Sequence, residues 1–146
     1  MTGWLLDTDV LSAFAPGKPA VPRKAAAWFE VRSERLFLSA ITAAEIEAGI
    51  ARLYRSGSRQ RADGLRDWFE RIVELYGERI LPFDLRAARI AGDLGDEARA
   101  RGQHPGFPDV AIAAIAKAND LTVLTLNGRH FEPLGISASN PFRRDR

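Results

Sequence analysis

The hydrophobic residues of this chain follow two different spacings along the sequence. Short apolar runs such as LTVLTL are bounded by polar residues, glycine or proline, which is typical of buried β-strands. Such runs predict strands at residues 4–6, 35–40, 79–83 and 121–126. We expect the central sheet of the fold to be built from these segments.

The stretches between the strands carry apolar residues at helical spacing. In residues 42–55, Ile46, Ile50 and Leu53 fall at positions i, i+4 and i+7, so one face of a helix is apolar. The remaining pattern predicts helices at residues 8–14, 23–33, 59–76, 85–101 and 109–118. Strands that alternate with helices of this length are typical of an α/β fold with a mostly parallel sheet.

Polar residues with oxygen atoms lie where the predicted strands end. Asp7 follows the first strand, Asn127 follows the last, and Glu45 lies in the first turn of the helix after the second strand. In parallel sheets the carboxyl ends of the strands meet at one edge, where ligands bind. Asp109 begins the helix before the last strand. Whether it reaches the same edge depends on the loop at residues 102–108, which the local pattern does not determine.

Each of these residues also has a purely structural interpretation. Asp7 or Asp9 can cap the short helix that follows the first strand, because aspartate is a preferred N-cap residue. Thr42 and Glu45 form a capping box, in which the glutamate reaches back to the threonine amide. An acid at the start of a helix is favoured by the helix dipole, and the Asn127-Gly128 pair favours a turn. Only the set as a whole indicates a function.

The composition limits the kind of metal that such a set can bind. The chain has no cysteine and two histidines, which excludes thiolate zinc sites and leaves little room for a histidine site. Carboxylate oxygens gathered at one edge suit Mg²⁺ or Mn²⁺, which take oxygen ligands and keep several waters. A bound cation relieves the repulsion among the carboxylates and promotes phosphodiester hydrolysis.

The length and charge of the chain set broader limits. The 146 residues suffice for one domain with a substantial core, and no signal peptide or transmembrane stretch is evident. We therefore expect one soluble, cytoplasmic domain. The net charge of +2 and the basic residues Arg143, Arg144 and Arg146 permit a polyanionic partner without identifying one.

Three segments carry a resemblance to a known family: LLDTDVLSAF, SAITAAEIEAGI and PDVAIAAIAKANDLTVLTLNGRHFEPLGI. In this order they resemble the signature segments of PIN-domain ribonucleases of the VapC toxin type, close to the FitB-like branch. The resemblance implies a PIN-like three-layer α/β/α fold with a mostly parallel central sheet, expected over residues 1–140 and followed by a short basic tail at 141–146. It also implies an Mg²⁺- or Mn²⁺-dependent endoribonuclease that forms a homodimer and is neutralised by a VapB/FitA-like antitoxin.

The resemblance assigns roles to particular residues. Asp7, Glu45 and Asp109 match the acids that bind the metal, and all three are expected to be catalytic. Asn127 is the fourth catalytic residue, at a position where the family often has aspartate. Thr125 matches a hydroxyl residue found near the metal.

Residues beside this set are given smaller roles. Asp9 stands where the family most often has asparagine, and we interpret it as a local cap or a partner of Asp7, with Thr8 as a weaker candidate partner. His130 is left outside the catalytic set. Of two acids in the helix at 85–101, Asp96 is expected to be solvated, whereas Asp93 could lie nearer the pocket and is also left outside the set.

The sequence leaves the roles of two groups of residues open. Arginines around the junction of two helices either contact RNA phosphates or are only solvated; these are Arg52, Arg55, Arg59 and Arg61. Four aromatic residues are expected to be mostly core, with some of them lining a groove for the antitoxin or the second protomer; these are Trp28, Phe29, Trp68 and Phe69.

Two other classes of protein compete with the ribonuclease interpretation. A receiver or phosphoaspartyl hydrolase domain also places acids directly after the first strand, but it needs a lysine late in the sheet. The chain has only Lys18, Lys24 and Lys117, and Lys117 falls inside a predicted helix. A catalytically silent PIN-like module that binds RNA or a protein partner is the second alternative.

Overall fold

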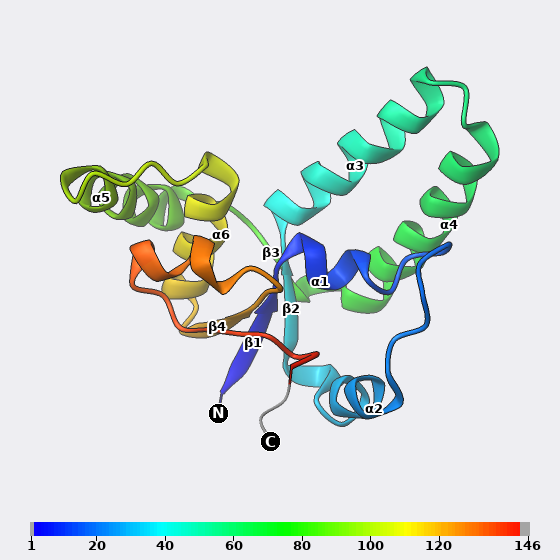
Figure 1. Cartoon of the computed structure of the whole chain (residues 1–146), viewed down its shortest axis with the longest axis horizontal. Helices are drawn as coiled ribbons and strands as arrows, with labels where there is room; N and C mark the ends of the chain where they lie inside the picture. Colours follow the sequence, from blue (N-terminus) through cyan, green and yellow to red (C-terminus); the bar gives the residue numbers. More distant parts are fainter. Residues whose placement is uncertain (1, 144–146) are drawn as a thin grey trace.

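The structure, a computed structural model, describes residues 2–143. Helices and strands alternate along most of the chain (Figure 1). The elements are β1 (Gly3–Leu6), α1 (Thr8–Ser12), α2 (Arg23–Val31), η1 (Ser33–Arg35), β2 (Leu36–Ser39), α3 (Ala40–Arg55), α4 (Arg59–Tyr76), η2 (Gly77–Arg79), β3 (Ile80–Leu81), α5 (Leu85–Ala100), α6 (Phe107–Ala118), β4 (Leu121–Leu124), η3 (Gly128–His130), η4 (Glu132–Leu134) and β5 (Ala138–Ser139), where η marks a 3₁₀-helix.

The five strands form one sheet in the order β3-β2-β1-β4-β5, and every adjacent pair is parallel. The central strand β1 pairs with β2 on one side and with β4 on the other. From β1 the chain first builds the β2 side of the sheet and later crosses to the β4 side. The carboxyl ends of β1 and β4 therefore form a topological switch point, where sheets of this kind bind ligands.

Side chains alternate between two cores along the strands. Leu5 and Val123 lie in a core with α5 and α6, whereas Leu6, Leu38 and Leu124 lie in a second core with α1 to α4. This alternation follows from the period of two in a strand. The result is the expected three-layer α/β/α arrangement, with α5 and α6 on one side of the sheet in Figure 1 and α2 on the other.

Most predicted elements are confirmed, and the differences lie at their ends. The α6 helix begins at Phe107, two residues earlier than predicted, with Pro108 in its first turn, where proline is tolerated because the amide there needs no helical partner. The α3 helix begins at Ala40 because Ser39, the last residue of β2, is its N-cap. The short strand β5 was not predicted, and both of its residues are exposed.

Two further features concern the surface and the end of the chain. The α3 and α4 helices extend from the sheet as an arm and meet at its far end (Figure 1). No helix within residues 2–143 is long and apolar enough to cross a membrane. Near the end of the described chain, the Phe142 ring lies 6.3 Å from that of Phe14 and 6.0 Å from that of Phe29. Residues 144–146 of the predicted basic tail lie outside the described residues.

Candidate active site

Asp7 lies at the switch point between β1 and β4 and is almost completely buried. Its backbone amide donates to the carbonyl of Leu124 at 2.8 Å, which continues the pairing of the two strands by one residue. Its carboxylate caps α1, with Oδ1 accepting from the Thr8 amide at 2.8 Å. The other oxygen, Oδ2, accepts from the Thr125 hydroxyl at 2.8 Å. The carboxylate is therefore held by groups that follow both strands.

The environment of Asp7 opposes its negative charge. Burial is the largest cause of a rise in the pKa of Asp7 from 3.8 to about 6, and the charges of Asp9 and Asp109 raise it further. The hydrogen bonds from Thr125 and Thr8 lower the pKa but do not compensate. A carboxylate in this condition gains from a cation more than an exposed one does.

Glu45 reaches this edge from α3, but not as a capping residue. The predicted capping box is wrong, because Ser39 is the N-cap and its hydroxyl accepts from the Thr42 amide at 3.1 Å. The exposed carboxylate of Glu45 instead accepts from the Thr8 hydroxyl at 2.7 Å, and that hydroxyl also lies 2.9 Å from the hydroxyl of Thr42. Thr8 thus joins α1 to α3 and holds Glu45 beside the Asp7 loop.

Asp109 does reach the same edge, a point that the sequence left open. It lies in the first turn of α6, half-buried, and the Nδ1 atom of His130 is 3.3 Å from its Oδ2. Burial is the main cause of a raised pKa at Asp109. His130 lowers that pKa, whereas Glu45 and Asp9 raise it. The contact between His130 and Asp109 was missed from sequence, because it depends on how η3 and α6 meet.

The side chains of Asp9 and Asn127 are joined by a hydrogen bond. The Asn127 side-chain amide donates to Asp9 Oδ2 at 3.0 Å, and the Leu126 amide donates to the same oxygen at 3.2 Å. The backbone amide of Asn127 donates to the Thr125 hydroxyl at 3.1 Å. The interpretation of Asp9 as a helix cap is wrong, since Asp7 is the cap. Asp9 binds the loop after β4 instead.

The four acids Asp7, Asp9, Glu45 and Asp109 therefore concentrate negative charge at one edge of the sheet. Among the ion pairs within residues 2–143, only that of His130 involves any of them. In the same part of the chain, no three acidic or imidazole side chains are close enough to enclose a metal ion alone. Mg²⁺ usually needs one or two carboxylates, with waters completing its shell. The donor set fits such an ion, because its negative charge faces a single basic side chain, that of His130, among the described residues.

Other predicted surface features lie away from this edge or are buried. The four arginines between α3 and α4 are all exposed. Arg55 is ten residues beyond Glu45 on α3, which is about 15 Å at 1.5 Å per residue. The expectation that four aromatic residues are mostly core is confirmed, because each is at most 8% exposed, and the expectation that some of them line a groove is wrong; these are Trp28, Phe29, Trp68 and Phe69.

The acids and the lysine left outside the set behave as expected. Asp93 and Asp96 are exposed on α5. Lys117 is exposed in the last turn of α6, eight residues from Asp109, which is about 12 Å along the helix. A receiver or phosphoaspartyl hydrolase would need that lysine close to the acids, so the position of Lys117 disfavours this alternative.

Comparison with known proteins agrees with this geometry. Residues 4–135 match the PIN domain family. Three relatives align over 94% of the chain: the plasmid stability protein StbB of Pseudomonas syringae pv. tomato (37% identity, 97% of that protein), the VapC ribonuclease Y4jK of Sinorhizobium fredii (37%, 96%) and the toxin FitB of Neisseria gonorrhoeae (34%, 97%). The crystal structure of FitAcB from N. gonorrhoeae has a TM-score of 0.83 at 34% identity, covering 97% of this chain and 99% of that one.

The match covers both strands of the switch point and the loops that carry Asp7 and Asn127. The relatives are similar over nearly their whole length, so the similarity is not limited to a short motif. The chain therefore belongs to the PIN-domain family, in the branch of the VapC and FitB toxins.

Proposed function

We propose that this protein is an endoribonuclease of the toxin class that depends on Mg²⁺ or Mn²⁺, and that it inhibits growth until an antitoxin neutralises it. The observation that carries the proposal is the group of acids at the switch point, in a chain whose relatives include a VapC ribonuclease and a toxin. RNA is the proposed substrate, and cytoplasmic location follows from that substrate.

The residues divide the work of hydrolysis among them. Asp7 and Asp109 would hold the cation, and Glu45, oriented by the Thr8 hydroxyl, would contribute a further oxygen or orient the attacking water. When bound, the ion lowers the pKa of a water and neutralises charge on the phosphate. In the reaction, the water oxygen bonds to phosphorus and gives up a proton, while the ester bond to the leaving oxygen breaks and that oxygen takes up a proton, so that the water supplies the hydrogen atoms of both products.

Asp9 and Asn127 act as a pair in this proposal. Asp9 supplies a fourth negative charge, and Asn127 fixes the orientation of that charge through its side-chain amide. The same hydrogen bond forms if the carboxylate and the amide exchange positions, with an asparagine at 9 donating to an aspartate at 127. The neutral residue at 127 is therefore compatible with catalysis, because the charge stands at position 9.

Exchanging the two groups tests this pairing. Asp9→Asn is expected to reduce cleavage and Mn²⁺ affinity by about 10- to 100-fold, because it removes one of the four negative charges, and a loss of this size is typical of groups that lie just outside the ligands of a metal. Asn127→Asp alone places two carboxylates in contact and is also expected to be impaired. Asp9→Asn/Asn127→Asp should recover most of both properties, measured by RNA cleavage and by calorimetric titration with Mn²⁺. A double variant as weak as the product of the two single effects would contradict the pairing.

The proposed activity itself is tested with purified protein and total cellular RNA. We expect discrete cuts with Mg²⁺ or Mn²⁺ and none with excess chelator. Asp93→Asn, which changes an exposed acid of α5 that forms no ion pair in the described part of the chain, is the matched control and should cut at the wild-type rate. RNA binding without any cutting, by folded protein free of a partner, would favour a silent binding module instead.

We further propose a VapB/FitA-like antitoxin as the protein partner and a homodimer as the assembly. The antitoxin proposal is supported by the similarity to the toxin FitB and to the FitAcB structure. A mostly apolar cavity of about 490 Å³ adjoins the acids, with Asp9, Leu126 and Phe142 in its lining. A partner segment that combines apolar residues with a basic side chain fits this surface, because it meets both the apolar cavity and the uncompensated acids.

A further inference from the structure

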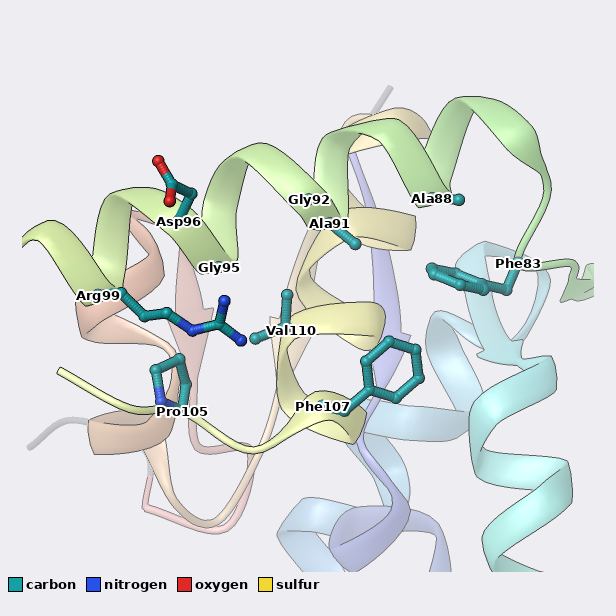
Figure 2. Close-up of a pocket in the computed structure, with 10 residues that line it drawn as sticks. All are labelled: Phe83, Ala88, Ala91, Gly92, Gly95, Asp96, Arg99, Pro105, Phe107 and Val110. Atoms are coloured by element: carbon teal, nitrogen blue, oxygen red, sulfur yellow. The ribbon is translucent and has the colours of Figure 1, made fainter.

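A second cavity lies on the other side of the α6 N-terminus, between that turn and α5 (Figure 2). Its volume is about 300 Å³, at the lower end of the range of roughly 300–1,000 Å³ that is usual for small-molecule sites. A space of this size suits one planar ring system with its attached groups.

The cavity is open on the side of α5 because two of the residues that line it there are glycines, which have no side chain. Gly92 and Gly95 both line it, and a Cβ atom added at Gly92 would meet no heavy atom within 4 Å. At Gly95 the added atom would be 3.8 Å from Val110, which is ordinary contact. Glycine in the middle of a helix lowers stability by about 0.5–1 kcal/mol relative to alanine. Packing against α6 does not require these two glycines, and they leave the space open.

The ends of the cavity carry a cation and aromatic rings. The Arg99 side chain extends across one end toward Val110, whereas Asp96 points away from the space (Figure 2). Arg99 has no carboxylate within ion-pair distance in the described part of the chain. At the other end, the rings of Phe83 and Phe107 meet edge to face with centroids 5.9 Å apart. Phe107 is 64% exposed, so its ring is accessible to a ligand.

The cavity neighbours the surroundings of Asp109. Phe107 and Asp109 are in the same turn of α6. Pro105 lines both this cavity and a neighbouring one of about 390 Å³ that contains Asp109 and His130. If RNA is cut beside Asp109, the nucleotide next to the cleaved phosphate would therefore lie near this cavity.

We propose that the hollow between α5 and α6 is a nucleobase subsite, in which a base next to the cleaved phosphate stacks against Phe107 and meets the guanidinium of Arg99. The subsite rests on the proposed ribonuclease function. Aromatic rings and arginine planes are the groups on which proteins stack unpaired bases. Hydrogen bonds from Arg99 to base edges would make the cut depend on the identity of that base.

Filling the hollow tests the proposal without disturbing the acids. Gly92→Leu places a side chain in the space, and Gly64→Leu makes the same change in α4, where an added Cβ also meets nothing within 4 Å. Leucine favours helix more than glycine does, so both variants should fold. The cut sites of wild type and both variants are mapped in total RNA with Mn²⁺. We expect Gly92→Leu and Arg99→Gln to lose about tenfold of the preference for the base at one fixed position beside the cut, with Gly64→Leu unchanged.

Binding is measured separately, so that failure of the subsite can be distinguished from failure of the nuclease proposal. Single-stranded RNA hexamers are added with excess chelator, and the amide signals of Gly92 and Gly95 are followed by NMR. Shifts that saturate, and that vanish in Phe107→Ala, would support the subsite even in the absence of cleavage. Unchanged base preference in folded Gly92→Leu, a uniform loss of cleavage at all sites, or no shift at these glycines would overturn it.

Discussion

Asp7→Asn is expected to lower RNA cleavage by on the order of a thousandfold, because several kcal/mol of electrostatic stabilisation of the transition state are lost with a metal-binding carboxylate. The change is nearly isosteric. An asparagine oxygen still accepts from the Thr8 amide, which keeps the N-cap of α1. The asparagine amide group can donate to the Thr125 hydroxyl, which keeps the contact with the residues after β4.

Asp7→Asn should lose cation binding together with RNA cleavage. In a thermal unfolding experiment, Mn²⁺ should raise the Tm of the wild-type protein and have little effect on Asp7→Asn, because only the former binds the ion tightly. Asp93→Asn should behave as wild type in both assays. Full metal-dependent cleavage by Asp7→Asn, in a preparation free of other nucleases, would remove Asp7 from the site.

The stability of the metal-free protein is expected to fall as pH rises from about 4 to about 6. The pKa of Asp7 is about 6 in the folded protein and about 3.8 in an unfolded chain. Between these values the folded state binds more protons than the unfolded state, so raising the pH favours unfolding. A difference of about two pKa units corresponds to roughly 3 kcal/mol. Below about pH 4 both states are protonated and the effect disappears.

Urea unfolding of wild type and Asp7→Asn at a series of pH values isolates this contribution. The difference in unfolding free energy between them should be small at pH 4 and reach about 3 kcal/mol in favour of Asp7→Asn at pH 7. Titrating groups that do not interact with Asp7 cancel in the difference, whereas its interactions with Asp9 and Asp109 are part of the contribution that is measured. Saturating Mn²⁺ should reduce the advantage of the variant at pH 7. A difference that does not change with pH would show that burial imposes no such cost on Asp7.

The parts of the site that sequence could predict are those that depend on strand ends. Asp7 follows a strand whose apolar run is unambiguous, and the parallel arrangement then places it beside the residues after β4. Glu45 was placed correctly at this edge for the same reason, although its hydrogen-bond partner was not. Ser39 took the capping role because β2 continues directly into α3, and a local capping pattern three residues later cannot compete with that geometry.

Contacts between segments that are far apart in the chain could not be predicted from the local sequence pattern. The approach of His130 to Asp109 depends on how a 3₁₀ turn packs against α6. The bond between Asp9 and Asn127 depends on the register of β1 against β4. The strand β5 has two exposed residues and no apolar run, so it exists only through pairing with β4.

The hydrogen bond from Thr125 to Asp7 joins residues 118 positions apart in the sequence. During synthesis on the ribosome, the first acid of the site is therefore made long before the segment that completes its surroundings. A nascent or truncated chain that ends before β4 lacks Thr125, Asn127 and half of the switch point. Such fragments should be harmless to the cell that makes them, and toxicity would begin only when almost the whole chain has been translated and folded.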